Sequence, residues 1–178
     1  NEIVMLLLMC GLAALGVSSG HEATVPGREP LIVAHRGASD DAPENTLASF
    51  RLGFAQGADL VEGDFRMTSD GCIVAMHDAT LVRTTGDPRE VSQVTRDDLR
   101  SLSAGDWGRW KDGDFRGEAI PTLEEVLAIV PDERGILLEI KDSARIVPTL
   151  VGELDRSGLD KDRITVITFD REVVKSMK

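Results

Sequence analysis

Short apolar stretches alternate with amphipathic stretches from residue 31 onward. Continuous apolar runs of about four to eight residues are typical of strands buried on both faces, whereas apolar positions three and four apart are typical of helices. The pattern predicts five strands, at residues 31–34, 59–65, 72–76, 135–140 and 164–169. It predicts helices at 44–55, 122–130 and 144–156, and a last helix after the fifth strand. This alternation favours an α/β fold with a mostly parallel sheet.

Three predicted helices carry boundary signals. Pro43 stands before the helix at 44–55, as is common at a helix start. Thr122 and Glu125 have the spacing of a capping box, and Gly158 marks the end of the helix at 144–156.

A long excursion separates the third strand from the helix at 122–130. Residues 79–120 have no strong apolar period except around 94–102, and such loops are usually functional lids or small insertions. Trp107 and Trp110 fall in this segment. They either cap a pocket or cover a core edge beneath a surface loop.

The N-terminal residues differ in character from the rest. Residues 3–17 are uncharged and apolar, which suits a signal peptide at 1–20 but is short for a membrane span. A polar linker at 21–30 and a domain at 31–178 follow. We therefore expect an exported protein, periplasmic or extracellular, with no stable membrane span after signal removal. Two alternatives remain open: a lipoprotein with lipidated Cys10, for which Met9 is a poor preceding residue, and a buried N-terminal helix.

Composition narrows the function further. The 178 residues, 42% of them apolar, fit about one domain. The formal net charge of −11 argues against binding the phosphate backbone of a nucleic acid. The aromatic content of 4% argues against binding single-stranded nucleic acid by stacking its bases on aromatic side chains. We expect no nucleic-acid partner, and the oligomeric state stays open.

Ionisable residues gather at or near the ends of four predicted strands, where α/β folds place their active sites. They are His35 and Arg36, Glu62 and Asp64, His77 and Asp78, and Glu139 and Lys141.

Three of these acidic residues are candidate metal ligands. Glu62 and Asp64 are two apart on a strand, so their carboxylates share one face. Together with Glu139 they favour a hard, oxygen-preferring ion, Mg²⁺ or Ca²⁺, over zinc. Taken alone, such a pair is more often a solvated sheet edge.

The basic candidates suit phosphate chemistry. His35 and His77 fit a proton-transfer pair near neutral pH, although a lone histidine is usually structural. Arg36 is either a surface charge or a bidentate phosphate clamp.

Eight short motifs occur in order along the chain: AHRG (34–37), PENT (43–46), EGD (62–64), SDG (69–71), HD (77–78), RTTG (83–86), IPTLEEVL (120–127) and LEIK (138–141). In this order and spacing the chain resembles the glycerophosphodiester phosphodiesterase family, within the superfamily of phospholipase C-like phosphodiesterases. The resemblance spans residue 31 to about residue 170. It implies a TIM-type (β/α)₈ barrel with an insertion after the third strand, at 79–120.

The resemblance also implies a role for each candidate. His35 and His77 would be the general acid and base, and Glu62, Asp64 and Glu139 would hold the divalent metal. Arg36, Glu44 and Lys141 would bind the substrate and its phosphate.

The implied activity is hydrolysis of a small glycerophosphodiester to sn-glycerol 3-phosphate and an alcohol. A lyase-type phospholipase of the same superfamily, which leaves a cyclic phosphate, is the first alternative, and a non-enzymatic binding domain is the second. A (β/α)₈ barrel needs about 250 residues, so we expect a barrel truncated after about five strands. Expressed alone, such a chain should aggregate or be inactive, because its sheet edges are open.

Overall fold

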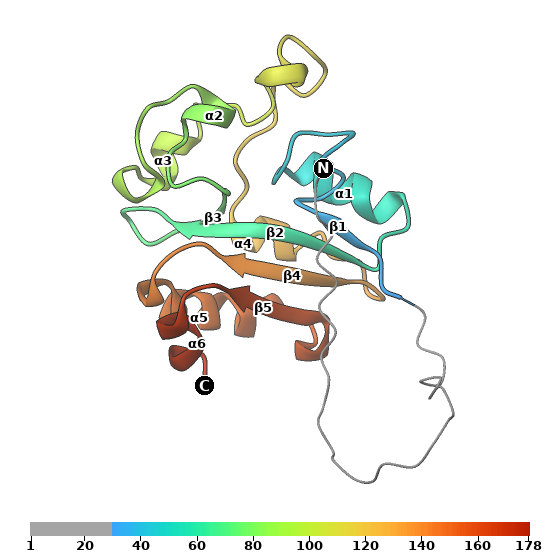
Figure 1. The fold of residues 1–178 in the computed structure, drawn as a ribbon, viewed down its shortest axis with the longest axis vertical. Coiled ribbons are helices and arrows are strands. Elements are labelled where there is room, and N and C mark those ends of the chain that lie inside the picture. Colours follow the sequence, from blue (N-terminus) through green and yellow to red (C-terminus); the bar gives the residue numbers. More distant parts are fainter. Residues whose placement is uncertain (1–29) are drawn as a thin grey trace, which may run out of the picture. The chain divides into compact units, whose positions relative to one another are not determined.

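Four parallel strands form the central sheet of the protein, described by a computed structural model over residues 30–178. They are β1 (Val33–His35), β2 (Leu60–Met67), β4 (Gly135–Ile140) and β5 (Ile164–Thr168), in the spatial order β1-β2-β4-β5 (Figure 1). β3 (Ile73–Ala75) pairs with the end of β2. All five strands lie close to their predicted positions. The predicted signal peptide, Cys10 and linker residues 21–29 lie outside the described residues.

β3 runs antiparallel to β2, whereas the four other strands are parallel, so the sheet is mostly parallel as predicted. Met67 pairs with Ile73 across a short turn, and a parallel pairing needs a crossover of about a dozen residues or more. The alternating side chains of β3 serve two cores, because Ile73 and Ala75 face the main cluster and Val74 faces a second one.

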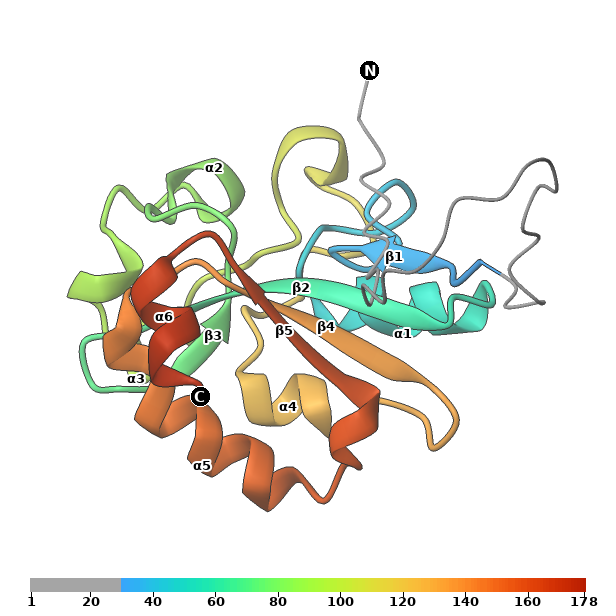
Figure 2. The same ribbon diagram turned by 60° about the horizontal axis from the view of Figure 1, so that its bottom comes forward.

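Helices from between the strands and from the C-terminal end of the chain pack on the sheet. They are α1 (Leu47–Ala55), α4 (Leu123–Leu127), α5 (Val147–Ser157) and α6 (Arg171–Ser176). Figure 2 shows α4 and α5 on one side of the sheet. The fully buried Phe50, Leu123 and Leu150 bring α1, α4 and α5 into the main core with Val61 and Leu138 of the sheet. This succession of strand and outer helix is the architecture of a TIM-type barrel, as predicted.

Residues 79–120 leave the sheet after β3 and return at α4. They contain α2 (Val82–Thr85), α3 (Arg96–Leu99) and 3₁₀ turns at Val91–Gln93 and Gly108–Trp110. Their apolar side chains form the second core cluster, with Leu81, Val91, Val94 and Leu99 among its members.

Local sequence signals set the helix boundaries. α1 begins at Leu47 rather than at residue 44, because Asn45 has a φ of +57° and Thr46 caps the helix by accepting from the Ser49 amide. Thr122 caps α4 with Glu125 as the spacing predicts. A 3₁₀ turn at Ala144–Ile146 precedes α5, and a further one at Lys161–Arg163 precedes β5.

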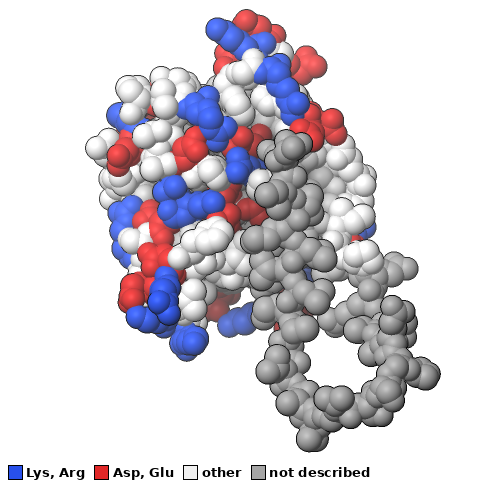
Figure 3. All heavy atoms as spheres, viewed as in Figure 1, with Lys and Arg blue, Asp and Glu red and all other residues white. Residues whose placement is uncertain are grey.

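The surface mixes both signs of charge. On the face shown in Figure 3, acidic and basic side chains are interleaved among the described residues rather than segregated. Among residues 30–178 no helix is long and apolar enough to cross a membrane.

Candidate active site

The turn after β1 brings its backbone against β2. Arg36 has a φ of +56° and Gly37 a φ of +77°. A Cβ atom on Gly37 would lie 2.5 Å from the Ser49 carbonyl carbon, so only glycine fits. This turn directs the Arg36 amide to donate to Glu62 Oε2 at 2.8 Å.

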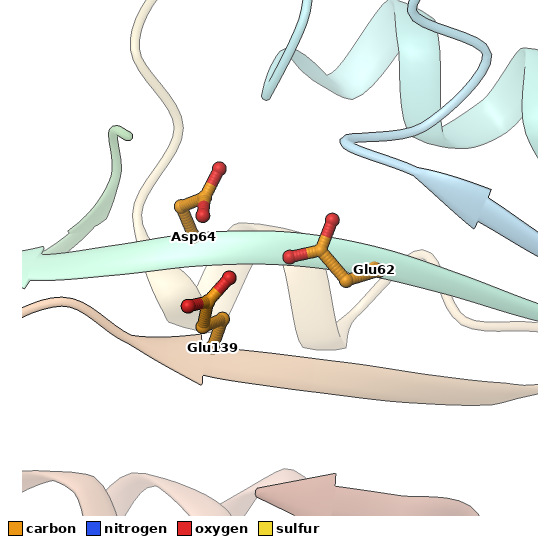
Figure 4. Close-up of side chains that lie close together, drawn as sticks. All are labelled: Glu62, Asp64 and Glu139. Atoms are coloured by element: carbon orange, nitrogen blue, oxygen red, sulfur yellow. The ribbon is translucent and has the colours of Figure 1, made fainter. Parts of the chain in front are cut away.

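Three carboxylates meet between β2 and β4. Glu62 and Asp64 extend from β2 and Glu139 extends from β4 (Figure 4). Each offers an oxygen atom within 4.8 Å of the others, and the residues are only 5%, 0% and 9% exposed. Asp64 lies directly opposite Glu139 in the parallel register. The structure therefore brings together all three predicted metal ligands.

The buried carboxylates fit a divalent cation. Glu62 Oε1 and Asp64 Oδ1 are buried without a hydrogen-bond partner, which is costly unless another group neutralises them. Burial, reinforced by the charges of Asp64 and Glu139, raises the pKa of Glu62 to about 7. Carboxylate oxygens at close range are the ligands that Mg²⁺ and Ca²⁺ prefer.

Asn45 holds Asp64 in place through two hydrogen bonds, and this role of Asn45 was not predicted from the sequence. Its side-chain nitrogen donates to Asp64 Oδ2 at 2.9 Å, and its side-chain oxygen accepts from the Asp64 amide at 3.0 Å. Both residues are buried. The PENT motif contained Asn45, but the pattern alone gave no partner for it.

Two cationic side chains border the cluster. Arg36 Nε lies 3.2 Å from Asp64 Oδ2, in an ion pair that lacks hydrogen-bond geometry. Lys141 Nζ lies 2.7 Å from Glu139 Oε1 and 3.4 Å from Asp64 Oδ1. Three ionised carboxylates against these two cations leave one negative charge, which a divalent cation would turn into one positive charge. Such a site suits the single negative charge of a phosphodiester.

Glu44 lies between two guanidinium groups. Its Oε1 accepts from Arg36 Nη1 at 3.1 Å, and both of its oxygens accept from Arg83. Burial raises the pKa of Glu44, but the hydrogen bonds and charges of Arg83 and Arg36 outweigh this and lower it overall. A carboxylate held in this way fixes the position of the Arg36 guanidinium group.

The two predicted histidines have different surroundings. His35 is half-exposed, and its Nε2 lies 3.8 Å from Glu62 Oε2 beside the carboxylate cluster. His77 follows β3, and its Nδ1 lies 2.8 Å from Asp78 Oδ1. His77 thus stands on the segment that leads into the insertion.

Arg66 ties His77 to the sheet, and the sequence analysis missed this residue too. Its Nε and Nη2 donate to the His77 carbonyl at 3.0 and 2.9 Å, and its Nη1 donates to the Lys141 carbonyl at 2.8 Å. The signal was its spacing, because Arg66 continues the alternation of Glu62 and Asp64 on β2.

Several aromatic side chains lie near cationic side chains. The Phe169 ring after β5 is 5.9 Å from Lys141 Nζ. The Trp107 ring lies 5.3 Å from the Arg83 guanidinium carbon, and the Trp110 ring lies 4.5 Å from that of Arg109. Trp107 and Trp110 of the insertion therefore each make a cation–π contact with an arginine side chain.

The chain matches a known protein family. The family described as "Glycerophosphoryl diester phosphodiesterase family" matches residues 35–177. The glycerophosphodiester phosphodiesterase of Caldanaerobacter subterraneus subsp. tengcongensis is 34% identical over 153 residues, which are 83% of this chain and 61% of that protein. The chain spans 44% to 61% of the length of the first curated relatives that it matches.

Two solved structures have the same fold. The glycerophosphodiester phosphodiesterase of Agrobacterium tumefaciens superposes with a TM-score of 0.74 at 31% identity, over 83% of this chain and 61% of that one. An Oleispira antarctica phosphodiesterase, solved with the product sn-glycerol-3-phosphate, gives a TM-score of 0.74 at 33% identity, over 83% and 60%. These matches confirm the predicted TIM-type barrel.

Proposed function

Since this chain belongs to the glycerophosphoryl diester phosphodiesterase family, we propose that its protein hydrolyses glycerophosphodiesters to sn-glycerol 3-phosphate and an alcohol. The observation that carries the proposal is the buried cluster of Glu62, Asp64 and Glu139 beside Arg36 and Lys141. The product complex of the Oleispira phosphodiesterase supports the same substrate class.

The three carboxylates would hold Mg²⁺ or Ca²⁺. When bound, such an ion supplies charge stabilisation to the phosphate oxygens as negative charge grows on them. Arg36 offers donors to the same oxygens, because Glu44 holds its guanidinium in place. Lys141 adds a second positive charge next to Glu139.

His35 and His77 would be the acid and base of the reaction. One imidazole takes a proton from the attacking oxygen, and the other gives a proton to the leaving alcohol. Asp78 accepts the Nδ1 proton of His77, so the Nε2 atom of that ring is left to exchange a proton with the substrate. Each imidazole supplies about 10²- to 10⁴-fold in rate.

The test is an assay of the protein at its natural length on glycerophosphocholine, with phosphorus NMR of the products. We expect sn-glycerol 3-phosphate to accumulate, a chelator to stop the reaction, and either Mg²⁺ or Ca²⁺ to restore it. Accumulation of a cyclic phosphate would instead support the lyase. Cation binding without turnover of any diester would support a binding domain, and either result would overturn the proposal.

We also propose that the protein is exported, with residues 1–20 as the signal peptide and 31–178 as part of the catalytic domain. The support is the apolar run at residues 3–17 followed by small residues. Cell fractionation and N-terminal sequencing of the mature protein test this, and a cytoplasmic product that retains residues 1–20 would contradict it.

A further inference from the structure

The guanidinium group of Arg83 holds two carboxylates from different segments. Arg83 lies on α2, in the RTTG motif, to which the sequence analysis gave no role. Its Nε donates to Asp78 Oδ2 at 2.6 Å. Its Nη1 and Nη2 donate to the two oxygens of Glu44 at 2.8 and 2.7 Å. All three of its nitrogen atoms are therefore engaged with these two side chains.

Each of the two carboxylates also contacts a residue of the proposed reaction. Asp78 Oδ1 lies 2.8 Å from His77 Nδ1. Glu44 Oε1 accepts from Arg36 Nη1 at 3.1 Å. A continuous path of polar contacts thus runs from the His77 ring through Arg83 to the Arg36 guanidinium.

We propose that Arg83 is a positioning residue, which fixes the His77 imidazole and the Arg36 guanidinium together by holding the carboxylate that orients each of them. The inference rests on the proposed function, in which His77 moves a proton and Arg36 binds the phosphate. Arg83 itself contacts neither reacting atom.

The physical reason is the fate of the carboxylates without Arg83. Asp78 would lose the partner of its Oδ2 and rotate more freely, so its hold on the His77 ring would weaken. Glu44 would have Arg36 as its remaining arginine partner. It would then occupy N–H donors of Arg36 that the phosphate of the substrate needs. Hydrogen bonds to Arg83 lower the pKa of both Asp78 and Glu44 against the opposing effect of burial, so both carboxylates stay ionised and ready to accept.

The geometry requires arginine at this position. A planar guanidinium can engage Glu44 in a bidentate pair and still reach Asp78, whereas an ammonium group is a point charge. The Trp107 ring lies against one side of this guanidinium, at 5.3 Å. Leu81, which precedes the short helix, is buried in the second core cluster, and Thr84 next to Arg83 is also buried. These two residues fix the position of the helix.

The insertion supplies a matched control. Arg89 also bridges two carboxylates, those of Asp87 and Asp98, and its side chain is 42% exposed against 36% for Arg83. Neither partner of Arg89 contacts a residue assigned to the reaction. Arg89→Ala therefore removes a comparable ion-pair bridge from the same segment.

The experiment measures the imidazole tautomer of His77 by nitrogen NMR. The protein is used at its natural length, and a His77→Asn variant assigns the signals of His77. We expect the Nδ1-protonated tautomer to predominate in the neutral His77 ring of the wild type. It should decline in Arg83→Ala and Arg83→Lys, and stay unchanged in Arg89→Ala. Asp78→Ala, which removes the acceptor without changing the sequence of α2, should reproduce the change.

Turnover gives the second measurement. We expect Arg83→Ala to lower kcat by about 10- to 100-fold through misplacement of His77, and free guanidinium ion to restore part of it. An unchanged His77 tautomer in both Arg83 variants would overturn the inference, as would equal losses of activity in Arg83→Ala and Arg89→Ala. If Arg83→Ala does not fold, Arg83→Lys and Asp78→Ala decide the outcome. The tautomer does not depend on catalysis, so a failure of the proposed function is recognised separately.

Discussion

Replacing Glu62 by glutamine should stabilise the cation-free protein at high pH. In the native state Glu62 is buried beside Asp64 and Glu139, and its pKa is raised from 4.5 to about 7. A carboxyl whose pKa is raised on folding favours the folded state below about pH 4.5 and loses that contribution as the pH rises through about 7. The difference corresponds to about 3 kcal/mol. Glutamine keeps an oxygen acceptor for the Arg36 amide but carries no charge.

The assay is urea unfolding of wild type and Glu62→Gln in the presence of a chelator, at pH 5 and at pH 8. We expect the variant to gain up to about 3 kcal/mol relative to wild type on going from pH 5 to pH 8. Glu133→Gln removes an exposed charge as a control and should show no such gain. Comparing the two proteins at each pH cancels the titration of carboxylates that lie outside the cluster.

Adding a cation should make the wild type more stable than Glu62→Gln at pH 8. At one hundred times its dissociation constant, Ca²⁺ or Mg²⁺ should stabilise the wild type by about 2.7 kcal/mol at pH 8, because it binds the folded state alone. Glu62→Gln should lose most of this stabilisation. The reasoning is refuted if the variant is no more stable than the wild type in chelator at pH 8, or if the cation stabilises both proteins equally.

Three further substitutions test parts of the site and its support. Gly63→Ala would place a Cβ atom 2.9 Å from Phe50 Cζ, so we expect urea unfolding to show a loss of about 1–3 kcal/mol. Asn45→Ala removes both hydrogen bonds to Asp64, and calorimetry should show weaker cation binding together with a loss of about 1–3 kcal/mol in stability. Thr122→Ala removes the N-cap of α4 and should cost about 1 kcal/mol while cation affinity stays unchanged; a changed affinity would contradict the separation of cap and site.

The sequence was sufficient to place the sheet and the carboxylate cluster. Short apolar runs, such as Ile73–Ala75 in β3 and residues 136–138 in β4, are typical of strands buried on both faces. Glu62 and Asp64 are two residues apart on one strand, so their side chains lie on the same face of the sheet. The parallel pairing of β2 with β4 places Glu139 opposite Asp64. These relations depend on backbone geometry alone, so they could be predicted without side-chain detail.

The direction of β3 and the start of α1 depend on local details that periodicity does not carry. The turn between Met67 and Ile73 is too short for a crossover, and this argument was available from the residue count. The left-handed conformation of Asn45 was not, because its side chain is committed to Asp64, a residue 19 positions away. The contacts of Arg66 and Arg83 likewise depend on side-chain conformations that the assembled fold selects.

The cation site and His77 belong to different parts of the fold, although the proposed reaction needs both. The carboxylates stand on β2 and β4, whose apolar side chains form the main core cluster. His77 begins the segment that the second cluster stabilises. The two parts also share polar connections, those of Arg83 with Glu44, of Arg66 with the His77 carbonyl, and of Arg109 with the Ser39 carbonyl.

Partly exposed polar contacts of this kind stabilise less than buried apolar surface does. The insertion should therefore open locally at a lower free energy than the sheet unfolds, and such an opening would displace His77 while the carboxylates stay assembled. A cation bound to Glu62, Asp64 and Glu139 would be retained in this opened state. Perturbations of the insertion should consequently reduce turnover before they reduce cation affinity, whereas perturbations of β2 or β4 should reduce both together.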